Sequence, residues 1–346
     1  MLTNKTHIEL EHLGKYKLIA HLSEYFQLKN NSSRLGIGDD AAVIAPAKPN
    51  VVMASKLIQE HIHFDLAYFP LKHLGYKAIT IAVSDIAAMN ARPTQIGVLL
   101  AVSNRFSLEA VEELMTGMQF CCTRYDIDLV GLDITSSHTG LSIAVNALGE
   151  VSPEQLTTRN GAQERDLICA SGDFGAAYTG LLILEREKKV FEVNPKQQPD
   201  LTGLDYVLER QLKPEPRVDV VHDLVKCGIR PNAMINVSEG LAAAVLQICQ
   251  ASNLGCELYE TKIPVDAVTF ETLKSLNIVA TTVALNGGED YELLFTVPQA
   301  DFDKVRQMEN VAVIGYTQES AAGCNLITND HRSIALRAQG FEQNEL

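Results

Sequence analysis

Several familiar sequence features are missing from this chain, and each absence excludes a class of protein. No apolar run reaches about 18 residues, the shortest length that commonly spans a membrane as a helix. Residues 1–14 are polar and lack the apolar segment of a signal peptide. The seven cysteines form no Cys-x-x-Cys pair and match no familiar zinc-site spacing. We therefore expect a cytoplasmic protein whose cysteines are reduced and mostly buried.

The standard nucleotide-binding signatures are also absent. There is no Gly-x-x-x-x-Gly-Lys-Ser/Thr loop and no His-Arg-Asp signature of protein kinases. The chain has 29 basic and 43 acidic residues, a net charge of −14, which argues against a nucleic-acid-binding surface. An acidic balance by itself is most often a solvated surface. Any ATP chemistry would need another device, such as carboxylates that hold Mg²⁺ against the phosphates.

The chain of 346 residues is long enough for two domains. Apolar periodicity predicts helices over residues 4–28, 71–91 and 108–125, and strands over residues 51–55, 96–102, 129–131 and 141–148. Further on, it predicts a strand over residues 167–171, a polar surface segment over 188–203, and a helix that begins near Arg217. We place the domain boundary near residues 151–153, which gives domains of residues 1–150 and 151–346. Because each half mixes helices with strands, we expect an α+β fold rather than one doubly wound sheet.

Carboxylates gather in four short segments beside expected turns or strand ends. They are Gly-Ile-Gly-Asp-Asp-Ala-Ala-Val at 36–43, Val-Ser-Asp-Ile-Ala-Ala-Met at 83–89, Gly-Leu-Asp-Ile-Thr at 131–135 and Asn-Gly-Gly-Glu-Asp-Tyr-Glu at 286–292. Taken singly, an aspartate after a glycine is commonly a turn or helix-cap residue. Asp85 differs because it stands alone in an otherwise apolar helix, where a buried carboxylate needs a partner.

Together these segments resemble the thiamine-monophosphate kinase family, in the superfamily of aminoimidazole ribonucleotide synthetase. The matching order also includes His-x-His-Phe ending at residue 64, Arg-x-Gly-Ala at 159–162 and a Ser-x-Gly-Leu segment at 238–241. The similarity runs over roughly residues 10–341. It implies a two-domain α+β fold of the aminoimidazole ribonucleotide synthetase type, with a mixed sheet and helices in each half. The N-terminal half would bind ATP and metal and form a homodimer, and the C-terminal half would complete the active site.

The resemblance implies ATP-dependent phosphorylation of thiamine monophosphate to thiamine diphosphate, with several Mg²⁺ ions between aspartates and phosphates. Mapped by motif, the metal ligands would include Asp40, Asp85, Asp133 and Glu239. The nucleotide-contacting residues would be Arg159, Ser238 and Asp133. The thiamine-phosphate positions would be His63, Glu289 and Phe341, the last standing where the family often has a tryptophan. No general base is assigned, because the acceptor is already a phosphate anion and phosphoryl transfer depends mainly on positioning and charge neutralisation.

Five positions depart from the family pattern, one of which is His61 in place of the glycine before x-His. Lys56 stands where the family strand has a metal-binding aspartate, and Leu132 replaces the second glycine of Gly-Gly-Asp. Asn236 and Glu239 replace the two aspartates of Asp-Ile-Ser-Asp-Gly-Leu. With less negative charge at these positions, fewer Mg²⁺ ions should bind. Lys56 would then either disrupt the metal site or serve as a point charge on phosphate.

Two main hypotheses follow from these departures. The first is a thiamine-monophosphate kinase with reduced turnover, and the second is a paralogue that binds nucleotide or thiamine phosphate without useful turnover. A third, another ATP-using member of the superfamily, is weaker because the chain has no C-terminal cysteine for carbamoyl dehydration. His61 and His63 lie two residues apart and would share one face of a strand. We expect one of them to face substrate rather than both to bind a metal, since no third ligand is evident.

Overall fold

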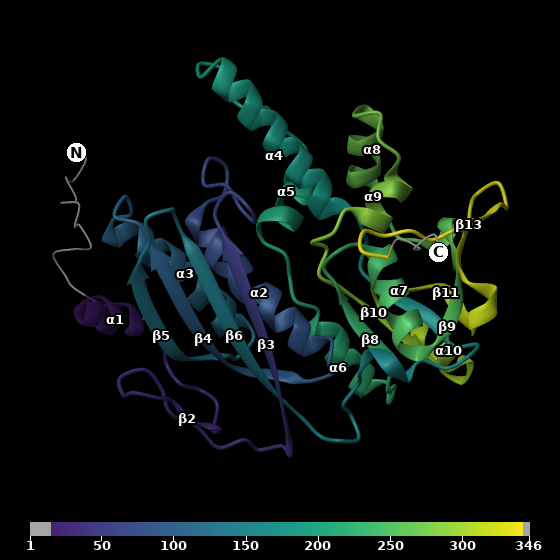
Figure 1. Ribbon diagram of the computed structural model, residues 1–346, viewed down its shortest axis with the longest axis horizontal. Helices are drawn as coiled ribbons and strands as arrows, with labels where there is room; N and C mark the ends of the chain where they lie inside the picture. The colour runs from purple at the N-terminus through teal and green to yellow at the C-terminus, as the bar shows by residue number, and fades with distance from the viewer. Residues whose placement is uncertain (1–14, 342–346) are drawn as a thin grey trace. The chain divides into compact units, whose positions relative to one another are not determined.

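The computed structural model describes residues 15–341, which divide into two compact units (Figure 1). The first unit comprises the described residues up to Ile86 together with Ala91–Pro153. The second comprises Ala87–Asn90 and the described residues from Glu154 onward. Each unit has its own mixed sheet with helices, which confirms the expected α+β class. Within residues 15–341, no helix combines the length and apolar character that crossing a membrane requires.

The first unit is built on a four-stranded sheet in the order β3-β6-β4-β5. Its strands are β3 (Asn50–Gln59), β4 (Arg92–Val102), β5 (Asp128–Ser136) and β6 (Ser142–Val151), and its helices are α1 (Lys15–Ser23), α2 (Leu71–Ala87) and α3 (Leu108–Arg124). The short strands β1 (Ser33–Leu35) and β2 (Val43–Ile44) form a separate pair. Strands β4 and β5 are parallel and are joined through α3, while β3–β6 and β6–β4 are antiparallel. The expected strands and helices of residues 51–148 are confirmed here, and residues 4–14 of the first expected helix lie outside the described part.

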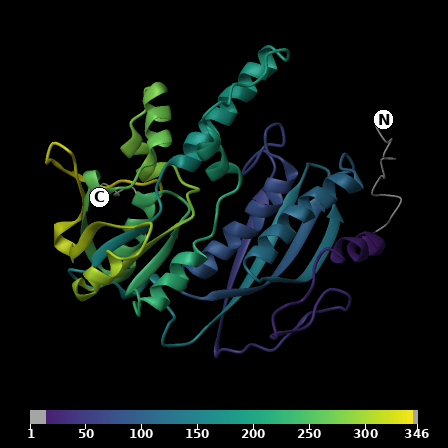
Figure 2. The ribbon, with the colours of Figure 1, turned by 180° about the vertical axis from the view of Figure 1, so that it is seen from behind.

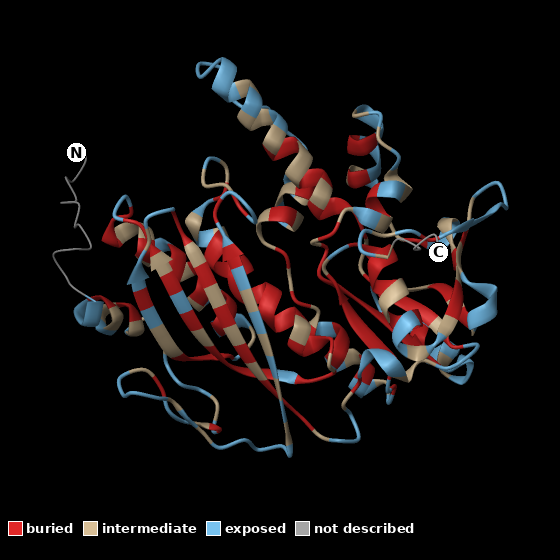
Figure 3. Cartoon of the chain, viewed as in Figure 1, coloured by how far each residue is buried: buried red, intermediate tan, exposed pale blue. Residues whose placement is uncertain are grey.

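One face of this sheet carries α2 and α3, and the other is open (Figure 2). Side chains alternate between the two faces along a strand. Ile58, Ile143 and Leu100 stand in one cross-strand row and are buried against the helices. In the neighbouring row, Leu57 and Leu99 are exposed, and the colour alternation along these strands is visible in Figure 3. The open face is therefore partly apolar.

Helices α2 and α3 cross at backbone contact because a glycine on each removes the side chain. A Cβ atom at Gly75 would lie 2.0 Å from the carbonyl oxygen of Leu114, and one at Gly117 would lie 1.9 Å from that of Lys72. Helix α3 begins at the position expected from the sequence because the Ser107 side chain accepts a hydrogen bond from the Ala110 backbone N–H. This close crossing fixes the position of α2, which carries Asp85.

The second unit contains a seven-stranded mixed sheet in the order β13-β12-β9-β11-β7-β10-β8. Its strands are β7 (Leu167–Ser171), β8 (Ala233–Val237), β9 (Leu254–Tyr259), β10 (Glu292–Val297), β11 (Val311–Glu319), β12 (Cys324–Ile327) and β13 (Ser333–Ala335). Its helices are α4 (Ala176–Val193), α5 (Asp205–Leu212), α6 (Val218–Lys226), α7 (Leu241–Ser252), α8 (Ala267–Ser275), α9 (Ala280–Asn286) and α10 (Phe302–Val305), and the short 3₁₀ helix η2 (Arg159–Gly161) precedes β7. Only β12 and β9 pair in parallel among these strands. Helix α7 packs on the sheet with an apolar core of residues such as Val245, Ile248 and Leu258.

The polar stretch 188–203 lies at the surface as expected, and its first residues continue α4 to Val193 through residues that favour helix, such as Lys189. One expectation about local structure is wrong. His61 and His63 do not share a strand face, because β3 ends at Gln59 and His61 adopts a left-handed φ of 67° in the turn that follows.

Candidate functional site

The first site feature is an ion pair between Lys56 and Asp85. Lys56 lies on β3 in the rows that face the helices, and Asp85 lies in the last part of α2. The Lys56 Nζ atom is 2.6 Å from the Asp85 Oδ2 atom, and about a third of each side chain is exposed, 30% and 33%. The lone carboxylate of the apolar helix therefore has a charged partner, as its surroundings require. That partner is the lysine that stands at the family's metal-ligand position.

A second ion pair joins Lys15 to Asp133. The Lys15 Nζ atom is 2.6 Å from the Asp133 Oδ1 atom, and the Ile134 backbone N–H donates to the same carboxylate oxygen at 3.0 Å. The hydrogen bond from Lys15 holds the pKa of Asp133 below its ordinary value and the pKa of Lys15 above its own. Both side chains are about half exposed, so solvent and salt weaken this pair. No pattern in the sequence marked Lys15, because it lies in a polar segment with no motif.

These two ion pairs lie on opposite faces of the sheet. Asp133 is in register with Leu99 and Leu57, whose side chains are on the open face, whereas Lys56 belongs to the rows covered by α2. Asp40 is exposed in the loop before β2, and its backbone N–H donates to the Asp39 side chain at 2.8 Å. Within residues 15–341, the one set of three potential ligand side chains whose atoms all lie within 4.8 Å of one another is a set of cysteines. A single chain thus does not gather its three mapped aspartates into one compact ligand set.

In the second unit, the structure brings Ser238 and Glu289 together. The Glu289 backbone N–H donates to the Ser238 carbonyl at 2.7 Å, and the Tyr291 N–H donates to the Val237 carbonyl at 2.9 Å. The loop that makes these contacts has positive φ angles at Gly288 (77°), Glu289 (60°) and Tyr291 (53°). Such conformations cost energy in residues other than glycine and concentrate at functional sites. Two positions predicted from separate motifs are therefore neighbours, and one of them, Glu289, lies on a strained loop.

A buried network of arginines and carboxylates contacts this loop, and the sequence analysis did not predict it. The Arg210 Nη1 atom is 2.8 Å from Glu292 Oε1, and the Arg217 Nη1 atom is 3.3 Å from Glu292 Oε2. The buried Asp290 carboxylate accepts a hydrogen bond from the Gly175 N–H at 3.0 Å. Burial raises the pKa of Asp290 to about 7, against the opposing effect of Arg210. Of the acidic residues in the motif at 286–292, Asp290 and Glu292 are buried, and Glu289 is half-buried.

The remaining predicted contact residues are dispersed. Arg159 is exposed on η2, and its Nη1 atom donates to Gln247 Oε1 on α7 at 2.8 Å. His63 is exposed in the turn after β3, where its Nδ1 atom accepts from the Gln59 N–H at 3.1 Å. Phe341 is the last described residue and is partly buried.

Of the altered family positions, Lys56, Leu132 and Asn236 lie on strands and Glu239 lies in a turn. Asn236 is buried on β8 opposite Leu293 of β10. Leu132 is partly buried on β5 opposite Val98 of β4. Glu239 follows Ser238 in the turn that leads into α7, and its Cα atom would lie 3.5 Å from a Cβ atom at Gly288. Ser238, Glu239 and Glu289 therefore form the most compact part of the candidate site.

Comparison with known proteins decides the family. Residues 38–151 match the family described as "AIR synthase related protein, N-terminal domain". A thiamine-monophosphate kinase of Bacillus subtilis is 32% identical over 324 residues, which cover 91% of this chain and 94% of that protein. The chain belongs to the thiamine-monophosphate kinase family. The resemblance drawn from the motifs is thereby confirmed.

Solved members of the thiamine-monophosphate kinase family share the fold. The enzyme of Stenotrophomonas maltophilia has a TM-score of 0.77 at 28% identity, covering 92% of this chain and 97% of that one. The structure "AaThiL complexed with AMPPCP and TMP" has a TM-score of 0.72 at 26% identity, covering 95% of this chain and 97% of that one. A hydrogenase maturation protein, HypE, in complex with ATP reaches a TM-score of 0.74 at 18% identity, which is a likeness of fold alone.

The acidic positions of this family member suit Mg²⁺ only in part. Magnesium binds oxygen ligands in strict octahedral geometry. At Asp85 and Asp133 a lysine ammonium already lies 2.6 Å from a carboxylate oxygen, and a like charge repels an incoming cation. Asp40 and Glu239 form no ion pair with any residue in the described range. Two of the four carboxylates that the resemblance assigns to Mg²⁺ are therefore paired with a lysine in this structure.

Proposed function

We propose that this chain phosphorylates thiamine monophosphate with ATP, at a turnover lowered by the lysines that hold two of its acidic positions. Support for the reaction comes from membership of the kinase family and from a relative whose structure is described as a complex with AMPPCP and TMP. The observation that carries the reduced turnover is the 2.6 Å contact between Lys56 and Asp85. The seven free cysteines agree with a cytoplasmic location.

The residues of the chain would act mainly by binding and positioning. Arg159 and Ser238 are assigned to the nucleotide, and His63, Glu289 and Phe341 to thiamine monophosphate, on the motif positions alone. The acceptor is a phosphate anion, so no residue has to remove a proton for attack. Bound Mg²⁺ would neutralise phosphate oxygens, and Asp40, Asp85, Asp133 and Glu239 are the residues assigned to hold it.

The altered positions weaken electrostatic stabilisation of the transferred phosphoryl group. A single misplaced group at such a site lowers the rate by roughly 10²–10³-fold. Lys56 cannot ligate a metal while protonated, although its ammonium group can attract phosphate oxygens as a point charge. Glu239 keeps the charge of an aspartate but is longer by one methylene, and Asn236 keeps one carbonyl oxygen without the charge. We therefore infer slow phosphoryl transfer with a weak dependence on Mg²⁺.

A second candidate function is binding without useful turnover. The contact between Lys15 and Asp133 favours it, because a second acidic position is then paired inside the chain. Such a protein would keep affinity for nucleotide or thiamine phosphate through residues such as Ser238 and Glu289. It would bind these ligands without releasing ADP at a useful rate.

We also propose a homodimer that covers the open face of the first unit's sheet. That face exposes Val51, Met53 and Leu57 from β3 and Leu99 from β4, with Met53 64% exposed. Large exposed apolar patches are uncommon on soluble monomers. The alternating residues of 96–102 that face the helices, such as Val98 and Leu100, belong to the core instead. A second copy is the occupant that the family resemblance implies.

A coupled assay of ADP release separates the two candidates. ADP release that depends on thiamine monophosphate supports the kinase. No release, together with a rise in the melting temperature when ATP or thiamine monophosphate is added, supports the binding protein, since ligand bound to the folded state stabilises it. If neither ligand changes the melting temperature with Mg²⁺ present, both candidates are wrong.

A further inference from the structure

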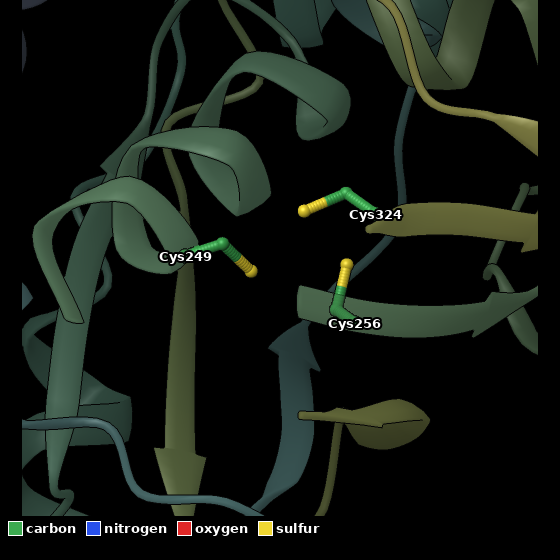
Figure 4. Close-up of side chains that lie close together, drawn as sticks. All are labelled: Cys249, Cys256 and Cys324. Carbon is green, nitrogen blue, oxygen red and sulfur yellow. The ribbon is translucent and has the colours of Figure 1, made fainter. Parts of the chain in front are cut away.

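Three cysteine side chains converge in the second unit, and none of them is a residue assigned above. They are Cys249 on α7, Cys256 on β9 and Cys324 at the start of β12. Their sulfur atoms all lie within 4.8 Å of one another. Figure 4 shows the three sulfurs directed toward a common point from the helix and the two strands. We call these three residues the trithiol cluster. The sequence analysis did not predict it, because the cysteines are too widely spaced along the chain to form a metal-binding motif.

Regular backbone structure holds each member of the trithiol cluster. Cys256 and Cys324 are direct partners in the parallel pairing of β9 with β12, and the Cys256 N–H donates to the Gly323 carbonyl at 3.0 Å. Cys249 is held by α7, and Asn253, with a left-handed φ of 53°, turns the chain from α7 into β9. The cluster is therefore preformed and depends on no flexible loop.

The surroundings of the trithiol cluster are mostly apolar, with one partly open side. Cys249 and Cys256 belong to the buried core, with exposed fractions of 2% and 0%, while Cys324 is half-buried. The three thiols share hydrogen bonds, which lower the pKa of Cys324 and raise those of Cys249 and Cys256. A buried cysteine can act simply as a small apolar side chain, but that role does not explain why three sulfur atoms meet at one place.

The geometry matches three bonds to one ion. Metal–sulfur bonds of about 2.3 Å in a trigonal arrangement place the sulfurs about 4 Å apart, inside the observed limit. Thiolates select soft ions such as Zn²⁺ and Cu⁺. No fourth His, Cys, Asp or Glu joins this set within the described residues, so a fourth position would be filled by water on the Cys324 side. Three thiolates leave a net charge of −1 with a divalent ion and −2 with Cu⁺, and apolar surroundings favour the smaller charge.

We propose that Cys249, Cys256 and Cys324 form a binding site for a thiophilic metal ion of charge two or more. Zn²⁺ is the ion with which we test the site. On binding, three metal–sulfur bonds form and the protons that the thiols still carry leave to solvent, so no electron is transferred. The bound ion would link α7, β9 and β12 through one cysteine of each element. The site is structural, and it does not depend on the proposed kinase reaction.

The test uses the reduced full-length chain under anaerobic conditions. Titration with Co²⁺, a spectroscopic substitute for Zn²⁺, is expected to give a sulfur-to-cobalt charge-transfer band that saturates at one ion per chain and disappears when Zn²⁺ is added. The half-buried Cys324 permits the variant Cys324→Ser with little risk to folding, and Cys249→Ala is the second variant. Each should weaken Co²⁺ binding by at least about 10-fold. Cys227→Ser is the matched control, since Cys227 is half-buried and outside the trithiol cluster.

Zn²⁺ should also raise the melting temperature of the unmodified chain and of Cys227→Ser, and leave that of Cys324→Ser unchanged. The proposal is overturned if Co²⁺ binds without a charge-transfer band, or if the band persists unchanged in both cluster variants. It is equally overturned if the reduced chain binds neither Co²⁺ nor Zn²⁺, or if two of the three cysteines form a disulfide even in the presence of reductant. A failed kinase assay has no bearing on any of these readouts.

Discussion

At the scale of the residue, Lys56 is the position where one side chain decides between two chemistries. Its ammonium lies 2.6 Å from Asp85 and occupies the place of a positive ion without being a metal. We predict that the triple change Lys56→Asp, Asn236→Asp and Glu239→Asp raises the rate of ADP release, by roughly 10²-fold or more. It should also make the rate depend more steeply on Mg²⁺, because the oxygen ligands are restored. The measurement is the coupled assay at several Mg²⁺ concentrations.

The matched control for this prediction is Lys72→Asp, which changes the same charge at an exposed position of α2. It should leave both the rate and the Mg²⁺ dependence as they were. High turnover in the unmodified chain, followed by its loss in Lys56→Asp alone, would reverse our interpretation. Lys56 would then take part in the reaction as a point charge on phosphate.

Asp290 allows a prediction about pH. Its pKa in the folded chain is raised to about 7 by burial, whereas an unfolded aspartate titrates near the ordinary value of about 3.9. The folded state therefore holds the proton more tightly, and the stability that this provides is lost as pH rises from about 4 through 7. Asp290→Asn does not titrate, so its stability relative to the unmodified chain should increase between pH 5 and pH 8. A change of about 1 kcal/mol or more is expected, since one pKa unit corresponds to about 1.4 kcal/mol.

Denaturant unfolding at pH 5, 6.5 and 8 measures this difference. Asp303→Asn, at an exposed position of α10, should show no comparable trend. A constant difference between Asp290→Asn and the unmodified chain across this range would show that Asp290 is ionised throughout, held by Arg210.

Motifs in the sequence pointed to residues that lie together in the second unit, but not to partners that only the fold brings close. Ser238 and Glu289 come from two motifs and meet at a 2.7 Å backbone hydrogen bond. Lys15, in contrast, has no motif around it, and its contact with Asp133 depends on how α1 packs beside β5. Long-range partners of this kind follow from tertiary packing, which local patterns do not encode.

At the scale of the element, the crossing of α2 and α3 is set by glycine. We predict that Gly75→Ala destabilises the fold by about 1–3 kcal/mol or more, because the added methyl group would lie 2.0 Å from the Leu114 carbonyl oxygen. Gly97→Ala is the control, since the nearest atom to its added methyl group is 4.0 Å away. Thermal or denaturant unfolding measures both. Equal stability of the two variants would mean that the helices separate at little cost.

Element prediction succeeded wherever periodicity and a clear end signal agreed. Helix α3 has an apolar face and a serine cap, and it begins where the pattern placed it. Periodicity set no end for helix α4, because its charged last turns have no apolar period but retain strong helix propensity. The turn after β3 was missed for a different reason, since the left-handed conformation of His61 follows no sequence rule.

At the scale of the whole molecule, the open face of the first unit's sheet raises the question of what covers it. Its apolar residues come from strands in register with one another, as Leu57 of β3 and Leu99 of β4 do on either side of β6. A sheet with one face on its helices and another apolar face exposed can lower its free energy by pairing with a second copy. The registered strands place these side chains on one surface, which no single residue of the sequence would indicate.

We predict that the chain is a dimer at micromolar concentration and that Leu57→Lys with Leu99→Lys shifts it toward monomer. Each lysine would place a charge in an interface whose core depends on apolar contact, and both copies would carry it because a two-fold interface repeats every change. Light scattering across a range of concentrations measures the mass, and Val225→Lys, at an exposed apolar position of α6, is the matched control. A monomer in the unmodified chain would remove the homodimer from the proposal, and a dimer that persists in the double variant would place the interface on another surface.

Because Asp133 lies on the same face as Leu57 and Leu99, dissociation of the dimer should also change how Asp133 responds to ligands. Comparing the thermal shift with ATP in the double variant and in Val225→Lys therefore tests whether this face contributes to the nucleotide site.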